Sequence, residues 1–208
     1  MLEIRNFRKA YGRFTVLSID ELAIKPGVFW IKGVNGSGKS TLLKAAAGIL
    51  DFAGEILLGG KISLKKDPVE YRRRVNFAEA EPVFPEFLTG REMMHLFASA
   101  KRAPSQQQDY LVDSMHMNAY VDEPLSTYSS GMLKKLSLAL AFLGKPDVIL
   151  LDEPLITMDT ASLQVLYRWI EEKHRDENVS FFLSSHQPLE TALTETLIVE
   201  NQTVTSNA

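Results

Sequence analysis

The chain has 208 residues, of which 45% are hydrophobic and 24% are charged, enough for one large α/β domain. Its formal net charge of −3 argues against a protein that binds nucleic acid through an excess of positive charge. The lack of cysteine excludes disulfides and cysteine metal sites, and no apolar run approaches the roughly 20 residues that span a bilayer. We therefore expect a soluble, cytoplasmic protein.

The first part of the chain has the pattern of short strands. Apolar residues recur between residues 2 and 24, with a turn signal at Tyr11-Gly12 and without the apolar core of a signal peptide. The apolar run Val28 to Ile31 predicts a buried strand, and a strongly helical segment follows at residues 39–50. A further pair of strands is expected on either side of Gly59-Gly60.

The sequence GVNGSGKST, residues 33–41, matches G-x-x-x-x-G-K-[ST] between the predicted strand and helix. Glycines let backbone N–H groups converge on phosphate oxygens, and the helix dipole points its positive end into the same loop. Lys39 can reach the β and γ phosphates, and Ser40 is placed to ligate Mg²⁺. A glycine turn that only caps a helix is the alternative. The predicted phosphate-binding residues are Asn35, Gly36, Ser37, Gly38, Lys39, Ser40 and Thr41.

Residues from about 80 to 135 predict a helical insert. Helical stretches replace strands, with prolines between them, until a fully apolar strand returns at residues 147–153. Such a strand is typical of a parallel sheet that is buried on both faces. We therefore expect a single domain, residues 1–208, with a mainly parallel α/β core, an N-terminal antiparallel sheet and the helical insert.

A second helix N-terminus without bulky side chains, which we call a helix entrance, is predicted at the sequence YSSG. It precedes the basic, leucine-spaced segment that ends before Gly144. Ser129 or Ser130 can cap this helix, and Gly131 keeps its entrance free of side-chain bulk. The N-terminus of this helix is either only well capped or a second anion-binding site. An anion site in a separate subdomain could not easily reach the first site's nucleotide within one chain, whereas two chains arranged head to tail would solve this.

The segment VILLDEP places Asp152 and Glu153 at the carboxyl end of a buried strand, where ligands gather in open α/β sheets. Asp152 can hold Mg²⁺ opposite Ser40, while Glu153 points the other way and could polarise an attacking water. The alternative is two acids that begin a turn before Pro154.

Two later residues have both a local and a functional interpretation. His186 ends the next apolar strand, where a neutral imidazole could contact a γ phosphate or orient water, although single histidines are mostly ordinary residues. Asp159 opens the following helix, so its simplest role is that of N-cap. The two roles do not exclude each other.

These motifs occur in the order found in an ABC transporter ATP-binding subunit, and the chain resembles that family over its whole length. The resemblance implies the ABC ATPase fold, built on a P-loop NTPase core, with ATP and Mg²⁺ as ligands. Tyr11 looks like the aromatic residue that stacks on adenine, although it could be an edge-strand tyrosine. Ser129 and Gly131 resemble the signature motif that faces the partner's nucleotide.

The resemblance also assigns catalytic roles. Lys39 resembles the catalytic lysine of the phosphate loop, Glu153 the catalytic base and His186 the switch histidine. Asp152 resembles the metal-binding aspartate, and Asp159 the aspartate that crosses the dimer interface.

The chain departs from the family pattern at two places. The family usually has Leu-Ser-Gly-Gly-Gln where this chain has Tyr-Ser-Ser-Gly-Met, and this variant, followed by a basic stretch, is similar to the drug- and antibiotic-exporter branch. Ala80 aligns with a family glutamine that senses Mg²⁺ and the membrane domain. We hypothesise that Glu79 or Glu81 takes its place.

The function implied is ATP hydrolysis that drives transport, in the direction of export. A separate transmembrane permease subunit selects the substrate, and the chain dimerises with itself or with another ATP-binding subunit on the cytoplasmic face of the membrane. The segment at residues 81–94 should form part of the groove that receives a permease helix.

Two alternatives remain. A non-transport ABC ATPase that acts on DNA or the ribosome is disfavoured by the acidic balance and the single cassette, and we expect no nucleic-acid partner. A weakly hydrolysing regulator is favoured slightly by Ala80 and disfavoured by the intact Lys39, Asp152, Glu153 and His186.

Overall fold

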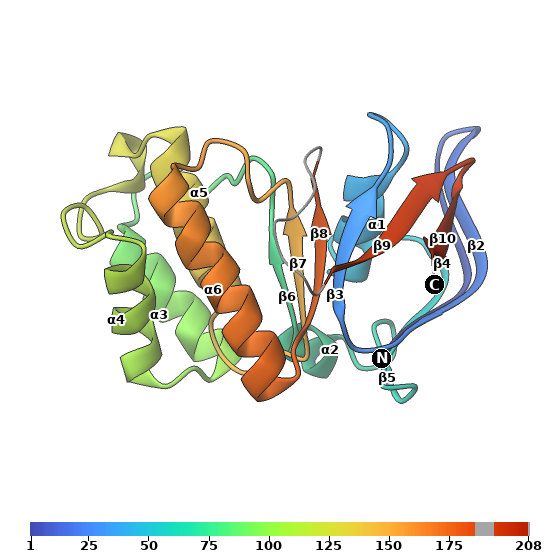
Figure 1. Ribbon diagram of the computed structural model, residues 1–208, viewed down its shortest axis with the longest axis horizontal. Helices are drawn as coiled ribbons and strands as arrows, with labels where there is room; N and C mark the ends of the chain where they lie inside the picture. Colours follow the sequence, from blue (N-terminus) through green and yellow to red (C-terminus); the bar gives the residue numbers. More distant parts are fainter. Residues whose placement is uncertain (186–193, 208) are drawn as a thin grey trace.

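The computed structural model describes residues 1–185 and 194–207, and within them the chain forms two sheets and a helical unit (Figure 1). The strands are β1 (Leu2–Tyr11), β2 (Phe14–Ile24), β3 (Val28–Lys32), β4 (Ala53–Leu58), β5 (Ile62–Ser63), β6 (Val75–Ala78), β7 (Val148–Asp152), β8 (Ser180–Ser184), β9 (Thr194–Glu200) and β10 (Thr203–Asn207). The helices are α1 (Lys39–Ala46), α2 (Pro68–Arg74), α3 (Gly90–Lys101), α4 (Ser105–Ser114), the 3₁₀ helix η1 (Leu125–Thr127), α5 (Ser130–Ala141) and α6 (Thr160–Glu177).

The N-terminal sheet has the strand order β2-β1-β4-β5 and is antiparallel throughout, as the alternation of apolar residues predicts. Ile4 lies opposite Leu22 on one side and Ile56 on the other. Ile4 and Ile56 are buried in one core cluster, together with Phe7. Cross-strand apolar contacts of this kind join the strands to one another. The shared core cluster joins the sheet to the rest of the domain.

The second sheet has the order β10-β9-β3-β8-β7-β6. Every described pairing from β9 to β6 is parallel, and β10 pairs antiparallel with β9. All residues of β7 and β8 are buried. Alternate residues of β7 enter different cores: Ile149 and Leu151 pack with the helical unit, and Val148 and Leu150 with the N-terminal sheet and α1. The two buried faces explain the continuous apolar run.

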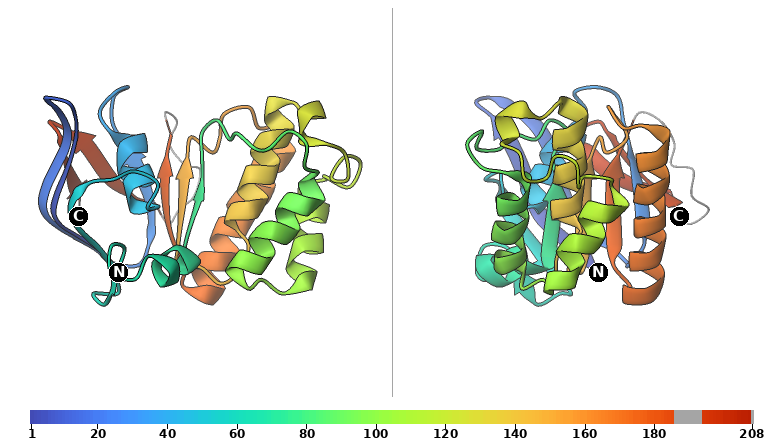
Figure 2. Two further views of the ribbon diagram at one scale, coloured as in Figure 1. Left: turned by 180° about the vertical axis from the view of Figure 1, so that it is seen from behind. Right: turned by 90° about the vertical axis from the view of Figure 1, so that its left-hand side faces the viewer.

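The helical unit lies on the far side of the parallel sheet from the antiparallel sheet, as Figure 1 and the left view of Figure 2 show. Helices α3, α4 and α5 occur at or near the predicted stretches. The amide of Gln107 in α4 donates to the carbonyls of Phe142 and Gly144 and accepts from the N–H of Gly144, which fixes α4 against the end of α5. The mixed α/β architecture with an antiparallel N-terminal sheet is therefore confirmed.

Two elements were missing from the sequence-based prediction, helix α2 and strand β6. Both are short, and β6 carries Asn76, a residue type that is depleted in strands. Asn76 is buried, and its amide donates to the carbonyls of Ala141 and Leu143 at 2.7 and 2.8 Å. Tertiary contacts with α5 thus override the local preference.

None of the helices in the described parts of the chain has the length and hydropathy to cross a bilayer.

Candidate functional site

Three parallel strands bring the candidate residues to one edge of the mixed sheet. Strand β3 leads into the loop before α1, β7 ends at Asp152, and β8 ends at Ser184. Ser184 pairs in register with Ile31 on one side and with Asp152 on the other. The strand ends therefore meet as the sequence predicts, although His186, assigned to the same edge, lies outside the described residues.

The loop from Gly33 to Gly38 turns tightly into the N-terminus of α1. Gly36 and Gly38 have φ angles of 78° and 108°, in the region that favours glycine. The ammonium of Lys39 is buried and donates to the carbonyl of Gly33 at 2.8 Å. The hydroxyl of Ser37 is buried with no hydrogen-bond partner among the described residues. An unpaired buried hydroxyl beside a bare helix N-terminus fits a phosphate group that accepts from both.

Ser40, Asp152 and Ser184 form a side-chain network below this loop. The hydroxyl of Ser40 donates to Asp152 Oδ1 at 3.0 Å, and that of Ser184 donates to the same oxygen at 2.6 Å. Asp152 and Ser184 are buried. Mg²⁺ prefers hard oxygen ligands such as hydroxyl and carboxylate groups. Ser40 and Asp152 therefore fit the role of protein ligands for a magnesium ion. Ser184 was not identified from the sequence.

Glu153 follows Asp152 with a left-handed backbone, φ 44°, which is uncommon for a residue other than glycine. Its N–H donates to both the carbonyl and the hydroxyl of Ser184, at 3.1 and 3.0 Å, and these bonds hold the turn. Glu153 lines a pocket of about 430 Å³ together with Val16 and residues 35–41. The phosphate loop and the carboxylate predicted to act with it therefore face one cavity.

A second pocket, of about 730 Å³, adjoins the phosphate loop and is lined by Phe14, Val16 and Trp30 among others. Tyr11, the predicted adenine-stacking residue, does not line it: Tyr11 ends β1 opposite Phe14, is 52% exposed, and has the ammonium of Lys9 4.8 Å from its ring centroid. Phe14 is 65% exposed and was missed from the sequence. The turn signal at Tyr11-Gly12 could have identified it, because a hairpin places both aromatic residues at the same end of the sheet.

The second predicted entrance begins α5. The hydroxyl of Ser129 accepts from the N–H of Met132 at 3.3 Å, and the N–H of Ser129 donates to the sulfur of Met132. A Cβ at Gly131 would lie 3.2 Å from the carbonyl of Thr157, so little room exists for a larger residue. The pockets found beside the phosphate loop do not include Ser129 or Gly131 among their lining residues.

Asp159 caps α6, the local role expected from the sequence. Its carboxylate accepts from the N–H and the hydroxyl of Ser162 at 2.8 and 3.0 Å. It also forms an ion pair with Lys135 of α5 at 2.9 Å, which connects the start of α6 to the second entrance. The hydrogen bond from Lys135, followed by those from Ser162, holds the pKa of Asp159 well below its usual range.

Lys134, the neighbour of Lys135, was missed from the sequence. It is 1% exposed, and its ammonium donates to the carbonyls of Glu79, Ala80 and Asp152. Burial lowers the pKa of Lys134 to about 8, while the nearby carboxylates, that of Asp152 first, act in the opposite direction. In the first turns of α5 Lys134 is buried while Lys135 is not, and from Leu136 to Ala141 every residue of the helix is buried.

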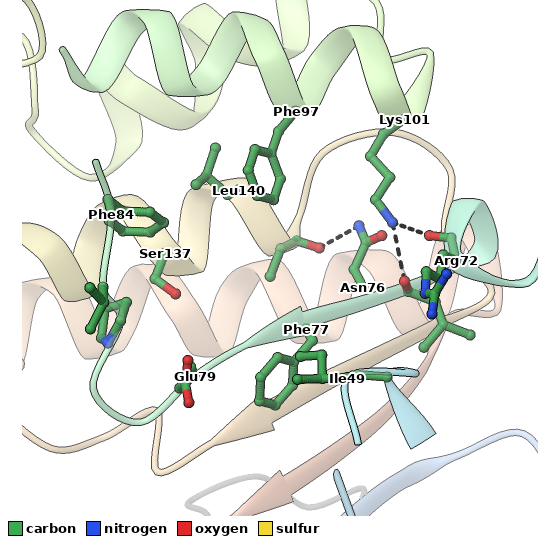
Figure 3. A pocket seen from close by; sticks show the side chains of 15 residues that line it. Ile49, Arg72, Asn76, Phe77, Glu79, Phe84, Phe97, Lys101, Ser137 and Leu140 are labelled. Carbon is green, nitrogen blue, oxygen red and sulfur yellow. Dashed lines mark hydrogen bonds between the residues drawn. The ribbon is translucent and has the colours of Figure 1, made fainter. Parts of the chain in front are cut away.

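Ala80 and its neighbours lie between the core and the helical unit. Glu79 pairs with Lys44 of α1 and lines a groove of about 260 Å³, in which its side chain lies near Phe77 and Ser137 (Figure 3). Among the described residues, no three His, Cys, Asp or Glu side chains come together as a metal cluster. Glu79 is held by its ion pair with Lys44, and the hypothesis that Glu79 or Glu81 takes the place of the family glutamine stays a prediction.

Comparison with known proteins agrees with this geometry. Residues 20–156, more than half of the chain, match the protein-family profile described as ABC transporter. The chain is 33% identical over 194 residues to a human phospholipid-transporting ATPase, ABCA7, and 31% identical over 202 residues to human ATP-binding cassette sub-family A member 13. Each alignment covers 89% of this chain but only 9% and 4% of those much longer proteins.

Solved structures share the fold. The structure of an ATP-binding subunit of an ABC transporter superposes with a TM-score of 0.88 at 26% identity, and the alignment covers 100% of this chain and 90% of that one. A dimeric ATP-binding cassette in a post-hydrolysis state, bound to ADP and Pi, gives a TM-score of 0.85 at 19% identity and covers 98% and 96% of the two chains. The chain therefore belongs to the ABC transporter family, as an ABC ATPase domain.

Proposed function

We propose that the chain, residues 1–208 with a helical insert at about 80–135, binds ATP and Mg²⁺ at the phosphate loop and hydrolyses the ATP between two cassettes. The observation that carries the proposal is the network of Ser40, Asp152 and Ser184, which adjoins the pocket shared by Glu153 and the phosphate loop. Lys39 and Glu153, two of the three predicted catalytic residues, line one cavity, whereas Ser129 and Gly131 do not line it.

The phosphate loop supplies the binding contacts of the proposed reaction. Backbone N–H groups of residues 35–41 and the N-terminus of α1 receive the phosphates, and the unpaired hydroxyl of Ser37 is a further donor. The ammonium of Lys39 exchanges its contacts with the loop carbonyls for contacts with phosphate oxygens. Tyr11 contacts the adenine, with Phe14 at the neighbouring position of the hairpin as a second aromatic surface.

Two oxygen ligands beside the loop would hold the metal. Ser40 and Asp152 would bind Mg²⁺, which supplies charge neutralisation between the phosphates when it is bound. Ser184 donates to the same oxygen of Asp152 that Ser40 contacts, and so fixes the orientation of the carboxylate.

Glu153 acts as the general base on the attacking water. The water forms the new bond to the γ phosphorus, its proton passes to the Glu153 carboxylate, and the bond to the ADP oxygen breaks. The N–H bonds to Ser184 hold the Glu153 backbone in place during this step. His186 is proposed to contact the γ phosphate; it lies outside the described residues.

A second ATP-binding chain, identical or different, completes the site. Its Ser129 and Gly131 at the N-terminus of α5 face the γ phosphate, and Asp159 lies at the interface between the chains. The close approach of Gly131 to the carbonyl of Thr157 and the ion pair between Lys135 and Asp159 support this assignment, because they bring the starts of α5 and α6 together.

The groove beside Glu79 is the proposed docking surface for a helix of a separate transmembrane permease subunit. Phe84, Phe97 and Leu140 line it, and Val83 at its rim is 89% exposed (Figure 3). An exposed apolar rim of this kind is typical of an interaction site. The chain would then act at the cytoplasmic face of the membrane, and the permease would select the substrate.

We propose export as the direction of transport. The support is the sequence Ser-Ser-Gly-Met before a basic helix. A relative is named as a phospholipid-transporting ATPase, and this name supplies the substrate class for a test of direction. ATP-driven uptake of a labelled phospholipid into inside-out vesicles from cells that produce the complex would support export of such a substrate. ATP-driven loss of the lipid from preloaded vesicles would contradict export.

Steady-state ATP hydrolysis by the protein with its co-purified membrane subunit tests the enzymatic part. We expect Glu153→Gln to lower kcat by about 100-fold or more while ATP still binds, because only the base is lost. Glu177→Gln removes an exposed ion pair with Lys173 at the far end of α6 and should leave the rate unchanged. A parent protein without hydrolysis, or a Glu153→Gln variant as active as the parent, would contradict the proposal.

A further inference from the structure

The ammonium of Lys134 connects three separate parts of the molecule. It extends from α5, is 1% exposed, and donates to the carbonyl of Glu79 at 3.0 Å, of Ala80 at 3.0 Å and of Asp152 at 3.1 Å. An ammonium has three N–H donors, and each of them has one backbone acceptor. Burying an unpaired charge is costly, so complete pairing is what allows a lysine to occupy the core.

The acceptors lie at the ends of two neighbouring parallel strands. Glu79 and Ala80 follow β6, and Asp152 ends β7. Ala80 has no side chain that could reach across, so the connection between its segment and β7 passes through main-chain carbonyls and Lys134. Glu79 also pairs with Lys44 of α1, which ties the same segment to the phosphate-loop helix.

The peptide between Asp152 and Glu153 is held from both directions. Its carbonyl, from Asp152, accepts from Lys134, and its N–H, from Glu153, donates to the carbonyl and the hydroxyl of Ser184. The orientation of this peptide determines where the Glu153 side chain leaves the backbone. The left-handed φ of Glu153 needs such restraint, because a residue other than glycine adopts it only when its surroundings enforce it.

We propose that Lys134 is a positioning residue that fixes the Asp152–Glu153 peptide and couples Glu153 to the helical unit. Its hydrogen bonds go to Glu79, Ala80 and Asp152 and not to the phosphate loop, and Lys134 does not line the pocket that the loop shares with Glu153. A movement of α5 would act on the Glu153 backbone directly through this side chain. The inference rests on the proposed role of Glu153 in hydrolysis.

Lys134→Met tests it, because the side chain keeps a similar length and loses all three donors. We expect kcat for ATP hydrolysis to fall by about tenfold or more, with KM for ATP within about threefold of the parent, because a small misplacement of a catalytic group affects the chemical step most. Lys134→Arg, which retains charge and donors, should recover at least about one third of the parent kcat.

Gln107→Met is the matched control. Gln107 also joins a helix of this unit to backbone groups through three hydrogen bonds, but at the opposite end of α5. Gln107→Met should lower the midpoint of urea unfolding, because three hydrogen bonds are lost, and leave kcat unchanged. Without nucleotide, hydrogen–deuterium exchange should rise at residues 79–80 and 152–153 in Lys134→Met and stay unchanged there in Gln107→Met.

Each outcome decides between the possibilities. A folded Lys134→Met variant with kcat within about twofold of the parent, or with unchanged exchange at residues 152–153, overturns the inference. An equal loss of kcat in Gln107→Met also overturns it, because the effect would then be general destabilisation. If Lys134→Met does not fold, Lys134→Leu, which also lacks donors, is judged by the same limits. A parent chain that does not hydrolyse ATP refutes the proposed function instead.

Discussion

The two helix entrances of this domain, at α1 and α5, are built in opposite ways. Helix α1 begins after Gly38, which has no side chain to cap it, and Lys39 and the unpaired Ser37 hydroxyl lie beside it. Helix α5 begins after Ser129, which closes a local pair of hydrogen bonds with Met132. The first entrance leaves N–H groups open to a ligand, whereas the second uses the N–H of Met132 in its own cap.

The difference explains how one nucleotide can use two entrances. The open entrance of α1 has the Ser40–Asp152 pair, proposed to bind Mg²⁺, and the Glu153 carboxylate at the same sheet edge, so one chain can supply the proposed ATP-binding contacts. The self-capped entrance of α5 is stable without ligand and has no share in that pocket. In the proposed function, α1 binds the nucleotide and α5 of the other chain completes the site afterwards.

The largest expected effect comes from the open entrance. Lys39→Ala should lower ATPase activity by about 100-fold or more and weaken ATP binding to the isolated chain, because the buried cation beside the phosphate loop is lost. Isothermal titration with ATP and a steady-state assay measure both. Tight ATP binding by Lys39→Ala would contradict the claim that the entrance of α1 binds the nucleotide.

An intermediate effect is expected at the self-capped entrance. Ser129→Ala should lower ATPase activity about tenfold while ATP binding to the single chain stays within about twofold of the parent, because this entrance acts on the other chain's nucleotide. It should also cost about 1 kcal/mol of stability through the lost cap. Ser130→Ala, one residue further along and outside the cap, is the control. A large loss of ATP affinity in the monomeric Ser129→Ala chain would refute the separation of roles.

The smallest effect concerns the ion pair beside the second entrance. Asp159→Asn keeps an N-cap for α6 but removes the pairing with Lys135, and it should destabilise the fold by about 0.5 kcal/mol, since the pair is half exposed.

The pH dependence follows from the lowered pKa of Asp159. The contribution of the ionised Asp159 to stability is complete at a pH above the ordinary pKa of a carboxyl group. It is lost as the pH falls below that pKa, because the unfolded chain binds the proton first. Urea unfolding measures the difference in the free energy of unfolding between the parent and Asp159→Asn, and this difference should be smaller at pH 3 than at pH 7. A larger difference at pH 3 would contradict the lowered pKa of Asp159.

The motifs that depend on local spacing could be predicted from the sequence. The phosphate loop, the buried strand before Asp152 and the cap at Asp159 all follow from neighbouring residue types, and the structure has the loop between strand and helix as expected. Parallel strand ends then bring Ser40 to Asp152, although 112 positions separate them.

The remaining features depend on tertiary contacts that leave little trace in the sequence. In the segment LKKL, Lys134 and Lys135 look alike, yet Lys134 is buried under the sheet edge and Lys135 pairs with Asp159. Only the helical phase relative to the core distinguishes them, and the core position of α5 depends on β6, which the sequence-based prediction missed. Ser184 was missed for a related reason, because its role comes from its register opposite Asp152.

The most direct test of the shared pocket is the mass of the Glu153→Gln variant with ATP and Mg²⁺, measured by analytical ultracentrifugation and, for the complex with the membrane subunit, by native mass spectrometry. The account predicts two cassettes held together by the trapped nucleotide, and a return to one when ATP is omitted from the isolated chain. A single cassette in the presence of ATP, both in isolation and in the co-purified complex, would contradict it.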